Sequence, residues 1–247
     1  MGRPGLPPVA AQELVRWFDG DRAVDGLDLD VQAGEIHAVV GLNGAGKTTL
    51  MRLLLGMLRP DAGRACVLGY DATDMPPEGW THVGHLIETP FAYPELTVHE
   101  NIAAAGLLHG LDRSRLSDAI DDAVDRFGLE RWRHRRARHL SLGNRQRLGL
   151  ASALMHEPSV LILDEPANAL DPAGVVFIRD LLLARKEQGT AILVSSHHLD
   201  ELARVADRIT VMHRGGRVGM LDPSGSELEK RFFALVFEAD LAQEQAR

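Results

Sequence analysis

The residue types best able to do chemistry are densest at positions 41–49, where the chain reads Gly-Leu-Asn-Gly-Ala-Gly-Lys-Thr-Thr. The run from Gly41 to Thr48 fits the phosphate-loop pattern G-x-x-x-x-G-K-[ST]. Glycines in such a loop let backbone N–H groups approach phosphate oxygens closely, Lys47 would reach the β- and γ-phosphates, and the Thr48 hydroxyl would ligate Mg²⁺. The nucleotide-contacting residues that we expect here are Gly41, Asn43, Gly44, Ala45, Gly46, Lys47, Thr48 and Thr49.

Apolar residues on both sides of this loop supply the strand and the helix that it needs. Residues 36–40 form a short apolar run typical of a buried strand, and the apolar residues of 50–58 recur at helical spacing. A strand, a glycine-rich turn and a helix aim backbone N–H groups and the positive end of the helix dipole at one point. We therefore interpret residues 41–49 as a nucleotide-binding loop, not as a glycine-rich turn with an incidental lysine.

Two adjacent carboxylates, Asp164 and Glu165, end a second apolar run at residues 160–163. The carboxyl ends of parallel strands are where an open α/β sheet places its ligand chemistry. We expect Asp164 to hold Mg²⁺, directly or through water, and Glu165 to polarise an attacking water. Acidic residues are also common where a strand simply ends in solvent, and the preceding phosphate loop favours the functional interpretation.

The order of sequence patterns indicates an α/β fold. Turn signals alternate with short apolar runs from 14 to 31, as in antiparallel strands. The pattern then becomes helical from 97 to about 155. Continuous apolar runs at 160–163 and 191–194 indicate strands buried on both faces of a parallel sheet. We expect a mainly parallel sheet, an N-terminal antiparallel part and an inserted helical segment.

Composition narrows the possible classes of protein. The 247 residues carry a net charge of −8, which argues against a surface built mainly to hold nucleic acid. Cys66 is the only cysteine, so no intrachain disulfide can form. No apolar run approaches the ~20 residues that span a bilayer. The basic run 131–139 could bind nucleic acid or anionic lipid headgroups, or could be a solvated edge facing the acidic remainder of the chain.

A third motif, residues 140–147, reads Leu-Ser-Leu-Gly-Asn-Arg-Gln-Arg and precedes the strand that ends at Asp164. In this order the motifs resemble those of the nucleotide-binding subunit of an ABC transporter, whose signature is usually L-S-G-G-Q-x-Q-R. The resemblance runs from about Leu14 to the C-terminus and implies a P-loop NTPase core. It also implies that Ser141, Gly143 and Asn144 face the ATP of a second subunit, with Ser141 as a helix N-cap.

Other positions match the family one at a time. Asp171, in Asn-Ala-Leu-Asp, resembles the D-loop residue that reaches across the dimer. His197, after Ser-Ser, resembles the switch histidine that contacts the γ-phosphate and helps to orient the attacking water, whereas His198 is interpreted as a bystander. Phe18 lies where the family usually has a tyrosine that stacks on adenine, although it could also be a core aromatic.

Two departures from the family pattern bear on function. Leu142 and Asn144 replace the usual glycine and glutamine of the signature, which implies weaker binding of the opposing ATP or pairing with a dissimilar subunit. Glu88 lies where a glutamine normally joins the Mg²⁺ site to the permease, and its carboxylate could ligate Mg²⁺ or be an exposed loop acid. The surrounding run 86–94 is similar to that of ATPases that export lantibiotics or bacitracin-like peptides for self-protection.

The resemblance implies a single ABC ATPase domain at 10–240, after an N-terminal tail at 1–9. Its α/β core, including the antiparallel part, comprises 10–88 and 157–240, and a helical subdomain with the signature comprises 89–156.

The expected function is ATP hydrolysis, with ATP and Mg²⁺, to power an exporter of antimicrobial peptides or drugs. The expected partners are a separate transmembrane permease and a second nucleotide-binding subunit, in a homodimer or heterodimer, with no nucleic acid. The expected location is the cytoplasmic face of the membrane, through the permease. Two alternatives are a soluble ABC ATPase acting on DNA or the ribosome, and a regulatory subunit that binds ATP without hydrolysis.

Overall fold

A computed structural model describes residues 6–88, 90 and 92–245. The chain forms two compact units. The first consists of Met1–Met75 and Leu182–Arg247, and the second of Pro76–Leu181. Residues 1–5 of the predicted tail lie outside the described residues.

The predicted antiparallel strands form a four-stranded sheet in the first unit, in the order β2-β1-β4-β5. Asp19 and Gly20 join the first two strands and both have positive φ, as a two-residue hairpin loop requires. Val9, the last residue of the predicted tail at 1–9, is fully buried at the start of the first strand. The strands are β1 (Val9–Phe18), β2 (Asp21–Val31), β4 (Ala62–Val67) and β5 (Tyr70–Asp71).

The second sheet of this unit is mainly parallel, as predicted. Strand β3 (Ile36–Val40) pairs in parallel with β8 (Ala191–Ser195) on one side and with β9 (Arg208–His213) on the other. Strand β10 (Gly216–Leu221) pairs antiparallel with β9. Every residue of β3 and β8 is buried, which explains why their sequences are continuously apolar rather than alternating.

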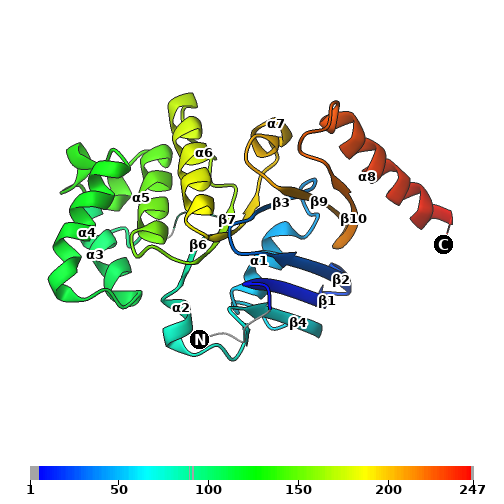
Figure 1. Cartoon of the computed structure of the whole chain (residues 1–247), viewed down its shortest axis with the longest axis horizontal. Helices are drawn as coiled ribbons and strands as arrows, with labels where there is room; N and C mark the ends of the chain where they lie inside the picture. The colour runs from blue at the N-terminus through cyan, green and yellow to red at the C-terminus, as the bar shows by residue number, and fades with distance from the viewer. Residues whose placement is uncertain (1–5, 89, 91, 246–247) are drawn as a thin grey trace. The chain divides into compact units, whose positions relative to one another are not determined.

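Three helices complete the first unit. Helix α1 (Lys47–Leu54) follows β3 and contacts the antiparallel strands, and α7 (Leu199–Ala203) follows β8. Helix α8 (Leu228–Gln245) lies along β9 and β10 (Figure 1). This helix extends five residues past 240.

A buried histidine on β3 makes the stability of the first unit sensitive to pH. His37 is 2% exposed, with Nδ1 2.8 Å from the backbone oxygen of Asp30 and Nε2 2.8 Å from Oγ1 of Thr210. Burial lowers the pKa of His37 below its ordinary 6.5. The pKa of His37 is lower in the folded protein than in the unfolded one. The contribution of the buried neutral ring to stability is therefore fully present above pH 6.5 and is lost as pH falls below it.

We therefore expect the thermal unfolding midpoint to fall between about pH 7.5 and about pH 5.5, and to fall less in a His37→Gln variant. His134→Gln is the control, because His134 is exposed. Thermal unfolding followed by circular dichroism measures the difference. Equal falls in all three proteins would contradict the assignment.

The second unit holds a parallel strand pair and most of the helices. Strand β6 (Val83–Leu86) pairs in parallel with β7 (Val160–Asp164), and Thr97 forms a capping box with Glu100 at the start of α3. The unit is wider than the predicted helical subdomain because it includes both strands. Its helices are α2 (Pro77–Trp80), α3 (Val98–Leu108), α4 (Arg113–Arg126), α5 (Leu142–Leu154) and α6 (Pro172–Glu187), which begins here, with short 3₁₀ turns at Glu130–Trp132 and Ala137–His139.

Candidate nucleotide-binding site

The predicted phosphate loop lies between the end of β3 and the start of α1. Gly46, the N-cap of α1, has φ 99°, and a Cβ there would lie 2.1 Å from the backbone oxygen of Ala23. A Cβ on Gly41 would lie 2.4 Å from the backbone oxygen of Met212. Side chains at either position would displace backbone, so the loop conformation requires both glycines.

The ammonium group of Lys47 is folded back over this loop. Its Nζ donates hydrogen bonds to the backbone oxygen of Gly41 at 2.7 Å and to that of Leu42 at 3.4 Å, and the residue is only 9% exposed. No acidic side chain lies in the first turn of α1, so its N–H groups and dipole favour an anion. The loop therefore combines a positioned positive charge with a helix N-terminus, which suits phosphate.

The predicted switch histidine leaves the sheet at the same edge as the loop. Val39 of β3 is the register partner of Ser195 of β8, so Gly41 and His197 each lie two residues beyond this pair. The ring of His197 lies 3.9 Å from that of His198, and the backbone N–H of His198 donates to Ser196 Oγ at 3.0 Å. The parallel sheet thus brings two predicted site elements to one edge from about 150 residues apart along the chain.

Phe18 lies at the end of β1 and is 40% exposed, so it is not a core aromatic. The guanidinium of Arg16 lies 4.8 Å from the centre of its ring. Arg16 is itself held by hydrogen bonds of 3.2 Å to the backbone oxygen of Arg59 and to Oδ1 of Asp61. One face of the ring is therefore covered by a fixed cation, a feature that the sequence analysis missed.

Trp17 supplies a matched control for the predicted adenine stacking. Trp17 is also 40% exposed and also has an arginine over its ring. Because adjacent strand residues point to opposite faces, Trp17 lies on the other face of the strand from Phe18. We expect Phe18→Ala to weaken ATP binding by about 5- to 150-fold, the effect of losing ~1–3 kcal/mol of base stacking. Phe18→Tyr should retain affinity, and Trp17→Ala should leave it unchanged. Isothermal titration tests this, and weaker binding in the Trp17 variant alone would contradict it.

In the second unit, β7 ends at Asp164, which is 3% exposed. Glu165 follows with φ 51°, a left-handed conformation that is unfavourable for a non-glycine residue. Gln146 of α5 is buried, and its Nε2 donates to the backbone oxygens of Pro166 at 2.8 Å and Glu165 at 3.3 Å. Gln146 therefore holds the backbone around Glu165, a positioning role that the sequence analysis did not assign.

The predicted signature and D-loop lie side by side in this unit. They line a cavity of ≈ 600 Å³ whose walls include Ser141, Gly143 and Asn144, which are expected to face the ATP of a second subunit, and Asp171, which is expected to reach across the dimer. Ser141 caps α5, because its Oγ accepts a hydrogen bond from the backbone N–H of Asn144 at 3.3 Å. Leu142 is 54% exposed at the same helix end, so its added bulk lies on the surface of this region.

Asp171 is engaged within its own chain. Its Oδ1 accepts hydrogen bonds from Arg147 Nη2 at 3.1 Å and from the backbone N–H of Gly174 at 3.0 Å. The first bond links the D-loop to the signature helix, and the second caps the first turn of α6. A contact across a dimer would therefore involve a carboxylate that is already oriented by Arg147.

Gly143 lies against the D-loop so closely that a Cβ there would be 2.7 Å from the backbone oxygen of Ala169. We expect Gly143→Ala to displace this loop and to reduce ATP turnover by about 10-fold or more, while ATP binding to the phosphate loop is retained. Ser152→Ala, a small substitution farther along the same helix, is the control and should leave turnover unchanged. Steady-state turnover and ATP affinity are measured on the same preparations. An equal fall of turnover and affinity in the Gly143 variant would contradict the prediction.

Three oxygen donors are predicted for Mg²⁺. The Thr48 hydroxyl belongs to the first unit, and the carboxylates of Asp164 and of the exposed Glu88 belong to the second. Residues 6–88, 90 and 92–245 contain no group of three or more His, Cys, Asp or Glu side chains that could hold a metal ion. Hydroxyl and carboxylate oxygens are donors that Mg²⁺ takes in proteins, commonly one or two carboxylates together with substrate phosphates. Thr89 and Phe91 of the run after Glu88 lie outside the described residues.

A buried strand, a glycine-rich loop with an inward-folded lysine, and a helix N-terminus define a P-loop nucleotide-binding fold. The family described as ABC transporter matches residues 24–168. The bacitracin transport ATP-binding protein BcrA of Bacillus licheniformis is 35% identical over 84% of this chain and 67% of its own length. The daunorubicin/doxorubicin resistance ATP-binding protein DrrA of Streptomyces peucetius is 38% identical over 82% of this chain and 61% of its own.

A solved ATP-binding subunit of an ABC transporter superposes with a TM-score of 0.81 at 27% identity, covering 97% of this chain and 99% of that one. The chain therefore belongs to the ABC transporter ATP-binding family and is an ATPase of that family. The predicted family and fold class are confirmed. The alignments with BcrA and DrrA span about two thirds of the length of those relatives.

Proposed function

We propose that this chain is the ATP-hydrolysing subunit of an exporter of antimicrobial peptides or drugs, working with a separate membrane permease. The observation that carries the hydrolytic part is the convergence of the phosphate loop and His197 on one sheet edge. The names of the relatives, which concern bacitracin transport and daunorubicin resistance, support the cargo class. The run 86–94 supports the same class by resemblance.

In this proposal the residues divide the work of hydrolysis. Backbone N–H groups of the loop and the Lys47 ammonium bind the β- and γ-phosphates and offset their negative charge. Thr48 and Asp164, with Glu88, would hold Mg²⁺, which would further neutralise the phosphates. Glu165 accepts a hydrogen bond from the attacking water and draws its proton, while His197 orients the γ-phosphate and that water.

The cavity formed by the signature and the D-loop is proposed to receive ATP bound by a second subunit. Its lining includes the N-terminal residues of α5, which Ser141 caps, and the positive end of that helix dipole favours a phosphate there. Asn144 keeps the amide of the usual glutamine but is one methylene shorter. A pair of identical subunits is the simplest assembly, and a dissimilar partner remains the alternative.

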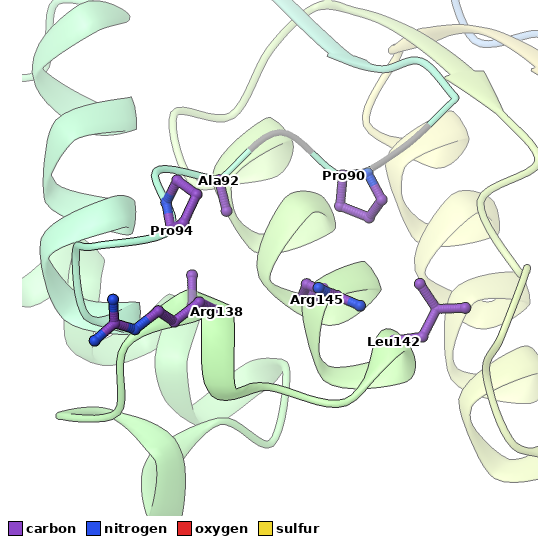
Figure 2. A pocket seen from close by; sticks show the side chains of 7 residues that line it. Pro90, Ala92, Pro94, Arg138, Leu142 and Arg145 are labelled. Atoms are coloured by element: carbon purple, nitrogen blue, oxygen red, sulfur yellow. The ribbon is translucent and has the colours of Figure 1, made fainter.

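A second cavity of the same unit suits contact with the permease. It has a volume of ≈ 270 Å³ and lies between the segment after Glu88 and the start of α5. Figure 2 shows Pro90, Ala92 and Pro94 on that segment, with Arg145 of α5 on the side of Pro90 and Arg138 near Pro94. A permease segment seated here would touch both the Glu88 segment and the signature helix, and so could transmit movement between them.

The basic run 131–139 is largely paired with acidic neighbours in its own unit. Arg138 Nη1 lies 2.8 Å from both carboxylate oxygens of Glu95, and Arg136 lies 3.6 Å from the same group. Arg133 pairs with Asp121. These contacts favour a structural role for the run over binding of nucleic acid, and so favour the exporter over an ATPase acting on DNA or the ribosome.

The proposed location is the cytoplasmic face of the membrane, through the permease. Within the described part of the chain, no helix has the length and apolar character needed to cross a bilayer.

Affinity purification of the tagged chain from detergent-solubilised membranes tests this proposal. We expect a polytopic membrane protein to co-purify, with nucleic acid at background. Arg145→Glu should reduce its recovery, whereas Arg126→Glu, an exposed site at the end of α4, should not. Recovery of ribosomes or DNA in place of a membrane protein would favour the soluble ATPase. A permease-bound preparation that binds ATP without turnover would favour the regulatory subunit.

A further inference from the structure

Helix α8 presents an exposed apolar stripe that has no part in nucleotide binding. Phe233, Phe237 and Leu241 are 51%, 64% and 41% exposed. Their spacing of four residues places them one above another on a single helix face. Single exposed apolar residues are ordinary, but a contiguous stripe of large ones marks an interaction surface.

The opposite face of α8 fixes which way this stripe points. Phe232 and Val236 are buried, and the helix lies along β9 and β10 (Figure 1). Asp240 Oδ1 lies 2.9 Å from Nε2 of His213 and 2.8 Å from Nη2 of Arg214. Because these contacts anchor the inner face, the stripe is held outward from the first unit.

The charges that flank the stripe are arranged symmetrically about Phe237. Lys230 lies seven residues before it and Glu244 seven residues after it, and seven residues is about two helical turns. Both side chains are exposed, and Lys230 Nζ lies 3.5 Å from Oε1 of Glu227 in a solvent-exposed pair, a kind that contributes little. An antiparallel copy of α8 centred on Phe237 would therefore set Phe233 against Leu241, and Lys230 against Glu244, with each pair formed twice.

We propose that a second copy of this chain packs on the stripe, α8 against α8, about a two-fold axis at Phe237. Such a contact uses the same patch on both copies, as a closed dimer requires. It does not depend on nucleotide, and so differs from the proposed closure on ATP. Three apolar side chains per copy bury much less than the ~800 Å² per partner of a stable interface. The contact is therefore weak in dilute solution, where it forms only transiently. It is well populated when the two copies are already held close together.

Disulfide cross-linking tests the two-fold geometry directly. Cys66 is the only cysteine, so a Cys66→Ser background reports on introduced cysteines alone. Under copper-phenanthroline and without nucleotide, we expect Phe237→Cys to form disulfide dimers. Phe233→Cys should not, because its two copies would lie about 12 Å apart along the helices, whereas bonded cysteines have Cβ atoms ~3.8 Å apart. A mixture of Phe233→Cys and Leu241→Cys chains should cross-link with each other.

Charge reversal tests the flanking pairs. In the Phe237→Cys background, Lys230→Glu or Glu244→Lys should slow cross-linking several-fold at low salt, and the double variant should restore the original rate. Glu238→Lys is the matched control, because Glu238 is exposed on α8 about a quarter-turn round from the stripe. Circular dichroism checks that each variant remains folded.

Three outcomes would overturn the proposal. The first is no dimer of Phe237→Cys, and the second is equally fast dimerisation of Phe233→Cys. The third concerns a lipid surface as the alternative occupant of the stripe. Co-sedimentation of the chain with anionic phospholipid vesicles, lost in Phe237→Glu and accompanied by no Phe237 cross-link, would assign the stripe to the membrane.

Discussion

Replacing Lys47 by methionine is expected to weaken ATP binding by roughly 10- to 100-fold, the effect of losing one charge-assisted hydrogen bond of ~1.5–3 kcal/mol. The ammonium is already held over the loop by the backbone oxygens of Gly41 and Leu42. Little side-chain freedom therefore remains to be lost when phosphate binds. Turnover should fall further than affinity, because charge develops on the transferred phosphoryl group.

Lys186→Met is the control for this substitution. Lys186 forms an ion pair with Asp207 and is not part of the proposed site. Partly exposed ion pairs of this kind contribute ~1 kcal/mol or less to folding stability, so the variant should remain folded. Its affinity for ATP should therefore be unchanged. Isothermal titration with ATP measures both variants. Equal affinities for wild type and the Lys47 variant would show that the phosphate loop does not bind ATP.

Replacing Glu165 by glutamine is expected to lower ATP turnover by about 10²- to 10⁴-fold, the range for loss of a general base, while ATP affinity is retained. Glutamine keeps the shape and one oxygen but cannot take a proton from water. The left-handed backbone of Glu165 and the bonds from Gln146 should persist, because those bonds end on backbone oxygens.

Glu157 offers a matched control, since it is another glutamate of the second unit with left-handed backbone, φ 53° against 51° for Glu165. Glu157→Gln should leave turnover unchanged. Phosphate release under saturating Mg-ATP measures both variants. Turnover of the Glu165 variant within a few-fold of wild type would show that another group activates the water.

Local patterns were enough to predict the phosphate loop and its surrounding elements. The glycines, Lys47 and the flanking apolar runs lie within about twenty consecutive residues, so their chemistry is readable from spacing. The Ser141 cap was predictable for the same reason, because an N-cap acts on a backbone N–H three residues away.

Contacts between distant segments could not be predicted in this way. The bonds from Gln146 to the backbone of Glu165 and Pro166 join positions about twenty residues apart. The close approach of Gly143 to Ala169 and the cover of Phe18 by Arg16 depend on how the chain folds back. The outward direction of Phe237 likewise follows from which face of α8 packs on β9 and β10. Periodicity alone does not identify that face when apolar residues occupy both sides.

Gel filtration of the Glu165→Gln variant with and without Mg-ATP tests directly whether two copies of the chain close on ATP. The protein should be dilute enough for the nucleotide-free chain to be monomeric. Removing the catalytic carboxylate should trap a closed pair with ATP bound between the phosphate loop of one copy and the signature of the other. We predict conversion from monomer to dimer on adding Mg-ATP. A chain that binds ATP but stays monomeric at saturation would contradict closure of two identical subunits on ATP.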